Sequence, residues 1–495
     1  NTAVGYRALE EFTTGGYTVA IGQEAGEKIT TADSNVLLGY RAGRQITTGA
    51  ANIAIGFEAL RDANTTSNIA IGGRAGVYAT TGTDNVYIGD GAGYSPGTAS
   101  DQVIIGHDAG YYARNNDVVI IGESAGYYAT GSNNVFIGKE AGKGGTTSAP
   151  FSSGENNTAV GYQALTGFTT GESNVAVGRE AGHDITTGTG NTLVGNAAGD
   201  KITTAEYNTA IGAGALGSQA ADADGNIAVG DFAMGDVNNA ASIENVVVGG
   251  YAGTGGTGQL IRTVAIGKAA LNSTGTANLT GAVAIGYNAG TAINHANAQS
   301  STLVGYLAGS SLTSGAGNAA FGYEALKDQS TNGWNSAFGN YSGHAHTGGY
   351  STFVGVKAGE NLTSGNNAIH IGFNTAASAV DVDTEYVIGA GTSFSDGLTG
   401  GGTETIRIGV STDYITNDFG ENATWTHSSD RRVKKNIEDN DLGLGFIEKL
   451  RTRKFQKKAP SEYPEEFDQH NPNTTERKNP CLLYTSDAAD EWCWG

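Results

Sequence analysis

Asn52-I-A-I-G-F-E-A-Leu60 is the stretch that decides the fold, because close copies of it recur along most of the 495-residue chain. Asn1-T-A-V-G-Y-R-A-Leu9 and Asn157-T-A-V-G-Y-Q-A-Leu165 are the same unit with small changes. Aligned on the central glycine, the chain contains 24 copies between Gly5 and Gly409, mostly 16 or 17 residues apart. Such a short, regular period over this length is typical of a solenoid.

Each unit carries a three-residue apolar run directly before its glycine, as in Ile53-A-Ile55. Such a run predicts a short strand that is buried on both faces. Only one face of a strand can point into a one-chain roll, so the second apolar face must meet something else, and the repeated middle alanine suggests a close backbone approach. We therefore predict an all-β fold, a parallel β-roll solenoid of about 24 short coils that associates with copies of itself.

Three other repeated positions predict features of each coil. A small residue stands three positions after every glycine, which predicts a crowded point inside the coil; it is Ala in 20 copies and Ser342, Thr375, Thr392 or Thr412 in the others. Asn stands four positions before the glycine in 14 copies, so stacked coils should place these amides in a hydrogen-bonded ladder. Glycine in turns such as Thr47-T-Gly49 supplies the positive φ that tight corners need.

Composition excludes several functional classes. The formal net charge of −21 argues against nucleic-acid binding, which needs clustered Lys and Arg. No apolar run reaches the roughly 18 residues that span a bilayer, so we expect no membrane insertion. Cys481 and Cys493 both lie in the last fifteen residues, so no disulfide framework holds the repeats. The histidines of the repeats share no metal-ligand spacing, and we expect neither a metal nor a cofactor.

The repeat units resemble the head repeats of trimeric autotransporter adhesins, which form parallel β-rolls in homotrimers. They also resemble the G-Y-x-A-L…T-T-G arrays of phage tail fibres. The resemblance covers residues 1–409 and implies a homotrimer as the self-associated form. It also implies a host cell-surface receptor as partner, with a glycan among the candidates. The tyrosines that follow many glycines, such as Tyr287, Tyr306 and Tyr323, could meet sugars or pack along the rod, and we favour packing.

The repeat stops after Gly409 and the charge balance then changes. Residues 430–458 contain ten Lys or Arg against five Asp or Glu. Leu442, Phe446 and Leu450 recur at four-residue spacing, which predicts an amphipathic helix. A new domain is therefore expected to begin near Ser428.

The stretch Ser429-D-R-R-V-K-K-N-Ile437, followed by Leu444-G-F-I-E-K-L-R-T-R-K-Phe455, resembles the opening of the self-cleaving intramolecular chaperone of phage tail spikes and fibres. The matches to the S-D-x-R-x-K motif of that family are Ser429, Asp430, Arg432 and Lys434. The resemblance implies a chaperone that drives trimerisation of the preceding fibre and then cuts itself off after the serine.

The chemistry of a serine peptidase suits the residues of this motif. A serine hydroxyl needs a nearby base, and a lysine of lowered pKa can serve in a Ser-Lys dyad. Ser429 would be the nucleophile, Lys434 the base, and the bond between Ser429 and Asp430 the one that breaks. The five-residue spacing cannot bring the two side chains together, so the tertiary fold must. A solvated basic turn is the simpler alternative.

These observations predict four segments: a solenoid over 1–412, a junction over 413–428, the start of a small α-containing chaperone autoprotease over 429–480, and a non-native tail over 481–495. A natural disordered tail is the alternative for the last. The chain opens inside a repeat, so we expect further sequence before Asn1. We also expect the chaperone to be truncated, and hence no cleavage of this chain.

Two functions fit the sequence. The first is a structural, host-contacting phage tail fibre, located in the virion tail, whose chaperone cleaves once in its own chain. The second is a trimeric adhesin of a bacterial surface that does not cleave itself. A polysaccharide-degrading spike is a third option, but no catalytic domain stands among the repeats.

Overall fold

The chain folds as an all-β parallel solenoid with almost no helix, which confirms the predicted fold class of its repeats. The structure, a computed structural model, describes residues 1–145, 151–218, 223–236, 242–256, 258–276, 278–420, 422–426, 434–439, 453–457 and 461. It divides into two compact units, residues 1–334 and residues 335–495.

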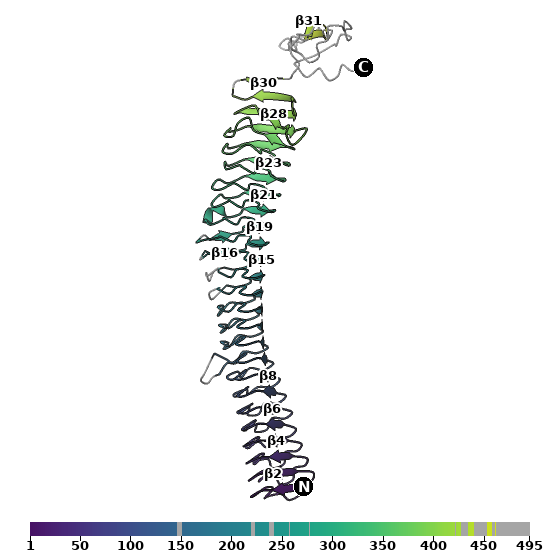
Figure 1. Cartoon of the computed structure of the whole chain (residues 1–495), viewed down its shortest axis with the longest axis vertical. Coiled ribbons are helices and arrows are strands. Elements are labelled where there is room, and N and C mark those ends of the chain that lie inside the picture. The colour runs from purple at the N-terminus through teal and green to yellow at the C-terminus, as the bar shows by residue number, and fades with distance from the viewer. Residues whose placement is uncertain are drawn as a thin grey trace, which may run out of the picture. The chain divides into compact units, whose positions relative to one another are not determined.

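In the first unit one short strand per coil stacks on the next, and all neighbours are parallel (Figure 1). These strands are β1 (Thr2–Val4), β2 (Val19–Ile21), β3 (Val36–Leu38), β4 (Ile53–Ile55), β5 (Ile69–Ile71), β6 (Val86–Ile88), β7 (Val103–Ile105), β8 (Val119–Ile121), β9 (Val135–Ile137), β10 (Thr158–Val160), β11 (Val175–Val177), β12 (Thr192–Val194), β13 (Thr209–Ile211), β14 (Ile227–Val229), β15 (Val246–Val248), β17 (Val264–Ile266), β19 (Val283–Ile285), β20 (Thr302–Val304) and β21 (Ala319–Phe321). A second small parallel pair consists of β16 (Leu260–Ile261) and β18 (Leu279–Thr280), and Ala296–Ala298 form the 3₁₀ turn η1.

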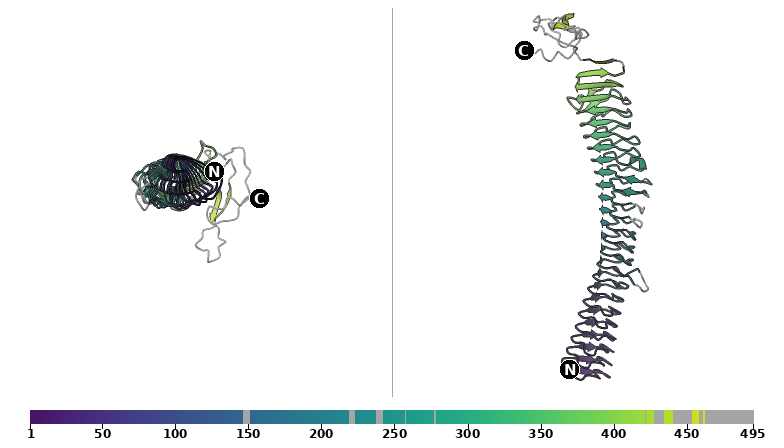
Figure 2. Two further views of the ribbon diagram at one scale, coloured as in Figure 1. Left: turned by 90° about the horizontal axis from the view of Figure 1, so that it is seen from below. Right: turned by 180° about the vertical axis from the view of Figure 1, so that it is seen from behind.

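The strands stack in strict register. In the β4–β5 pair, Ile53 lies opposite Ile69, and the alanines and last isoleucines of the two strands also face each other. Along the rest of the coil, backbone N–H groups again donate to the next coil, as from Gly43 to the Ala59 carbonyl at 2.8 Å. Because hydrogen bonds between coils run around the whole turn, the backbone is satisfied with little regular secondary structure. The stacked coils are seen from behind in Figure 2.

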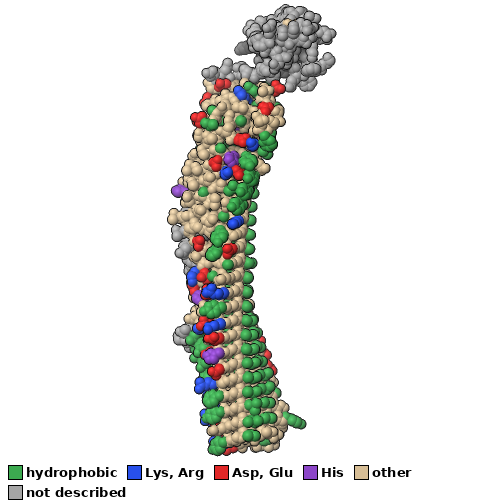
Figure 3. Space-filling view, viewed as in Figure 1, with side chains coloured by type: hydrophobic (Ala, Val, Ile, Leu, Met, Phe, Trp, Pro, Cys, Tyr) green, Lys and Arg blue, Asp and Glu red, His purple; other side chains and the backbone are tan. Residues whose placement is uncertain are grey.

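The strands do not bury both faces within one chain. The middle residue of each strand points into the roll, and Ala54 and Ala70 are fully buried there. The first and third residues point outward, so that Ile71, for example, is 38% exposed. In the first unit these side chains form an apolar column along the strands (Figure 3). The interpretation of the middle alanine as a point of close approach to another chain is therefore wrong, because that alanine already packs inside its own coil.

The central glycine of each coil is required by its backbone conformation. Gly56 and Gly72 have φ of +138° and +141°, a region open essentially to glycine alone. A Cβ on Gly56 would lie 2.3 Å from the carbonyl oxygen of Gly72 in the next coil. The carbonyl cannot withdraw without breaking the stack, so the invariance of this glycine has both a conformational and a steric cause.

The predicted crowded point three residues after the glycine is confirmed for most coils. Ala25 and Ala59 are fully buried there, and so are Ser342 and Thr375, which replace alanine. The prediction is wrong for Thr392 and Thr412, which are exposed. Their coils differ because the strand continues beyond the central glycine, so the chain leaves in an extended direction and does not turn into the interior.

The interior is filled by two positions whose sizes compensate. In most coils where the middle strand residue is large, the residue four positions after the central glycine is itself glycine, as in the pairs Leu37 with Gly43 and Phe136 with Gly142. A Cβ on Gly142 would lie 2.3 Å from the Phe136 ring. Where the middle residue is Ala54, the later position is Leu60. Coils with small residues at both positions, such as Ala70 with Gly76, are filled from their neighbours, because Leu60 and Tyr87 lie against Gly76, as close packing demands.

The predicted asparagine ladder is present. Asn157, Asn174, Asn191 and Asn208 are buried, and each side-chain Oδ1 accepts the backbone N–H of the next asparagine at 2.9 to 3.0 Å. The Nδ2 group of Asn174 donates to the Gly188 carbonyl at 2.9 Å. The ladder thus satisfies backbone donors that would otherwise be buried without a partner.

The second unit begins with the same stack and ends differently. Its described strands are β22 (Ser336–Phe338), β23 (Thr352–Val354), β24 (Ile369–Ile371), β25 (Thr375–Ala376), β26 (Tyr386–Ala390), β27 (Leu398–Thr399), β28 (Thr405–Val410), β29 (Asp413–Asp418), β30 (Asn422–Thr426), β31 (Lys434–Asp439) and β32 (Arg453–Lys457). Strands β22, β23, β24, β26 and β28 are parallel neighbours.

Two antiparallel strands follow the last coil. β29 pairs with β28, and β30 pairs with β29, so part of the predicted junction over 413–428 forms strands. Pairing with β29 covers the edge of β28, which would otherwise present free N–H and C=O groups. The stack of parallel coils therefore ends at β28.

Candidate functional site

The predicted cleavage site falls mostly outside the described residues. Ser429, Asp430 and Arg432 are not among them, and neither is the stretch 442–450 for which a helix was predicted. Lys434 is the first residue of β31, which pairs antiparallel with β32 and places Lys434 opposite Lys457. The Ser429–Lys434 dyad therefore stays a prediction.

The outward face of the strands is a distinctive apolar surface of the first unit. Val4, Ile21, Ile137 and Ile211 are 36 to 56% exposed, and most remaining first and third strand residues are half-buried. A continuous apolar column of this kind marks an interaction surface. The column has no catalytic character, because it contains no ionisable side chain.

Charged side chains of the first coils are mutually paired. Arg41 Nε lies 2.8 Å from Glu24 Oε2, and Arg44 Nε lies 2.6 Å from Glu27 Oε2 in the coil before. The position two residues after the central glycine alternates in sign over Arg7, Glu24, Arg41, Glu58 and Arg74. Because these charges neutralise one another from coil to coil, they support the stacking register and do not suggest a ligand site.

Aromatic side chains of the first unit stack from coil to coil, and two groups of them have three or more rings. The predicted packing along the rod is found for Tyr287, Tyr306 and Tyr323, whose rings stack at 5.3 and 5.0 Å. A second cluster, which the sequence analysis missed, consists of Tyr78, Tyr94, Tyr111, Tyr112, Tyr127, Tyr128 and Phe151. This cluster could have been predicted from the sequence, because tyrosine stands at the fifth or sixth position after several successive central glycines.

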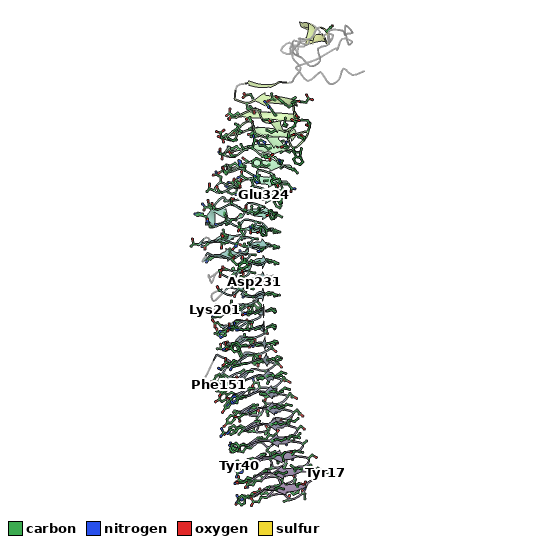
Figure 4. The ribbon with its side chains drawn as sticks, in the orientation of Figure 1. Tyr17, Tyr40, Phe151, Lys201, Asp231 and Glu324 are labelled. Atoms are coloured by element: carbon green, nitrogen blue, oxygen red, sulfur yellow. The ribbon has the colours of Figure 1, made fainter. Side chains whose placement is uncertain are left out.

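In this second cluster, Phe151 belongs to the longest spacer between two repeats and stacks on Tyr112 at 4.5 Å. Arg114 lies 6.0 Å from both of these rings. Phe151 and Tyr40 lie on one side of the stack in Figure 4, and Tyr17 lies on the other. Most faces in the cluster are covered by neighbouring rings, so it is a packed cluster and not an open platform.

Two buried histidines lie inside the second unit. His346 and His370 are both fully buried, and Phe353 lies between them with ring centroids at 4.8 and 5.8 Å. No ring nitrogen of the pair makes a hydrogen bond of ordinary geometry. Burial lowers the pKa of His346 to about 4, partly offset by the Leu362 backbone. Burial and the neighbouring His346 lower the pKa of His370 to about 4.

We expect the second unit to lose stability as the pH falls from about 6.5 to about 4. The folded state holds both imidazoles neutral, whereas the unfolded chain binds protons below its ordinary histidine pKa, so acid favours unfolding. Each histidine contributes a slope of up to about 1.4 kcal/mol per pH unit in this window. Thermal unfolding followed by circular dichroism at pH 7 and pH 5 measures the loss.

The control for this prediction is the double variant His346→Ile with His370→Phe, because other coils hold Ile29 and Phe136 at these positions. The variant should lose less stability between pH 7 and pH 5 than the parent. The same loss in both proteins would contradict the role of the histidines.

Among the described residues, no group of three or more His, Cys, Asp or Glu side chains could hold a metal ion. Within the same residues, no helix is long and apolar enough to cross a membrane. No protein-family model matches the chain, and no curated protein matches its sequence.

Proposed function

We propose that the chain is the rod of a phage tail fibre, a homotrimer that contacts the host. Its C-terminal domain assists trimerisation and cleaves itself off between Ser429 and Asp430. The observation that carries the proposal is the outward apolar face of the strands, which recurs in coil after coil. One copy of the chain leaves this face in water, and burying it between copies would release about 25 cal/mol for every Å² removed from solvent.

A bacterial surface adhesin without autoproteolysis is the alternative, because the same roll and the same apolar face would serve it equally. The two functions differ in the segment after Gly409, where the S-D-x-R-x-K motif supports the fibre. Both functions require the association of three chains, so a measurement of the oligomeric state tests the proposed trimeric rod. Self-cleavage is expected of the fibre alone, so it distinguishes the two functions.

We expect the chain to be a trimer by light scattering, and Ile55→Glu with Ile71→Glu to give folded monomers. Both side chains point outward from the strands and are half-buried or exposed in one chain, so the roll itself tolerates the change. In a trimer the new carboxylates would be buried close to one another without partners, which costs several kcal/mol per site.

The matched control adds two glutamates away from the strands. Thr31 and Thr48 are exposed, and Thr31→Glu with Thr48→Glu should leave the trimer intact. A parent chain of monomer mass with a folded circular dichroism spectrum would refute the trimer. The pair Ala54→Glu and Ala70→Glu is a poor test of assembly, because both alanines are buried in the roll and the variant would unfold.

A further inference from the structure

A groove of about 420 Å³ crosses successive coils of the second unit. It is lined by Tyr350, Asn366, Asn367, Asp383 and Thr384, which occupy the fifth and sixth positions before the central glycines of their coils. The lining is held by backbone hydrogen bonds, such as that from the Thr384 N–H to the Asn366 carbonyl at 2.8 Å. The groove is therefore a feature of the stack and not of one loop.

The polar side chains of the groove are partly anchored and partly free. Asp383 Oδ1 accepts hydrogen bonds from the Asn366 backbone N–H at 2.6 Å and from its Nδ2 at 3.1 Å. Asn366 Oδ1 in turn accepts from the Gly349 N–H at 2.8 Å. Among the described residues, Asp383 Oδ2, the Tyr350 hydroxyl, the Asn367 amide and the Thr384 hydroxyl have no hydrogen-bond partner. The groove thus presents unpaired donors and acceptors to a ligand.

Tyr350 occupies its position at a conformational cost. Its φ is +60°, a left-handed value that the same position also adopts in coils with Ser34, Asp84 or Tyr207 there, and a bulky residue tolerates it less well than Ser, Asp or Asn does. The side chain gains little packing in return, because it is 65% exposed. The exposed ring of Tyr350 is therefore available to a ligand at the edge of the groove.

We propose that this groove binds a neutral oligosaccharide, and the proposal rests on the host-contacting role of the rod. A pyranose ring presents an apolar face of C–H groups, which suits the exposed Tyr350 ring, and hydroxyls that both donate and accept. Asp383 Oδ2 can accept from a hydroxyl, while Asn367 and Thr384 can do both. The acidic carboxylate, on a chain of net charge −21, disfavours sialylated or uronic-acid saccharides.

The test is isothermal titration of the full chain with maltohexaose, cellohexaose and chitohexaose, and with a hyaluronan hexasaccharide as the acidic comparison. We expect at least one neutral hexasaccharide to bind at millimolar concentration and hyaluronan not to bind. Tyr350→Ala and Asp383→Ala should each weaken the affinity about tenfold or more, which corresponds to about 1.4 kcal/mol.

The matched control is Tyr207→Ala. Tyr207 has the same place in its coil, a φ of +57° and 68% exposure, but the next two coils carry Gly225 and Glu244 there and supply no row of amides and hydroxyls. The Tyr207→Ala variant should bind the neutral hexasaccharide with the same affinity as the parent chain. Binding that survives Tyr350→Ala, a preference for hyaluronan, or no binding of any neutral hexasaccharide overturns the assignment. If the chain is a trimer by light scattering but binds none of these saccharides, the saccharide site is rejected and the proposed trimeric rod is not.

Discussion

Gly178→Ala is expected to lower the free energy of unfolding of its part of the rod by about 3 kcal/mol or more. Gly178 has φ of +137°, and a Cβ there would lie 2.3 Å from the Gly195 carbonyl oxygen. That carbonyl cannot move away freely, because the Gly195 N–H is bonded to the Val177 carbonyl at 2.8 Å. The residue therefore suffers both a forbidden backbone conformation, at about 1 to 3 kcal/mol, and a steric clash.

Circular dichroism measures the thermal midpoint of the Gly178→Ala variant. Hydrogen exchange then shows which coils have lost stability, since a solenoid can open locally. Gly281→Ala is the matched control. Gly281 has φ of +67°, in the left-handed region that many other residues of this chain adopt, and a Cβ there would have no atom within 4 Å. Gly281→Ala should therefore lower the free energy of unfolding by only about 1 kcal/mol. Equal, small losses in both variants would contradict the close approach at the central glycine.

Ser429→Ala is expected to abolish self-cleavage altogether in a chain that carries a complete chaperone domain of the proposed kind. The parent should break between Ser429 and Asp430 and release a fragment that begins D-R-R-V-K-K. Removing the nucleophile, or the base with Lys434→Ala, leaves no route for attack on the peptide bond. Intact-mass spectrometry of the purified product reads the outcome directly.

Arg431→Ala is the control for cleavage, because that position varies within the motif, and it should still be cut. An uncut parent, or a Ser429→Ala variant that is still cut at this bond, would refute the assignment. An uncut parent that is trimeric by light scattering would favour the adhesin over the fibre.

The repeated positions were readable from the sequence because each one makes the same contact in coil after coil. The asparagine four residues before the glycine meets another asparagine at the same place, so spacing alone predicted the ladder through Asn157, Asn174 and Asn191. The same argument predicted the small residue inside the coil. It failed at Thr392 and Thr412, because the last strands extend beyond the glycine and end in an antiparallel pairing that no repeat encodes.

The orientation of the strand could not be read in the same way. A run such as Ile53-A-Ile55 is apolar throughout and contains no polar residue to mark the outer face. In this coil the interior already holds Leu60, and the space that remains admits the alanine and not the two isoleucines. The pairing of Leu37 with Gly43 and of Phe136 with Gly142 was visible in the sequence as a pattern, but its meaning came from the rings and methyl groups that fill the space.

The sequence by itself therefore determined the solenoid, its period, the amide ladder and the crowded alanine position, because these depend on contacts between identical positions one period apart. Only the tertiary structure decided which strand face is outward, that His346 and His370 share a buried site with Phe353, and that Tyr350 and Asp383 line one groove. Those contacts join different residue types from different coils. No periodicity specifies them, since they follow from which neighbours fill the same volume once the coils are stacked.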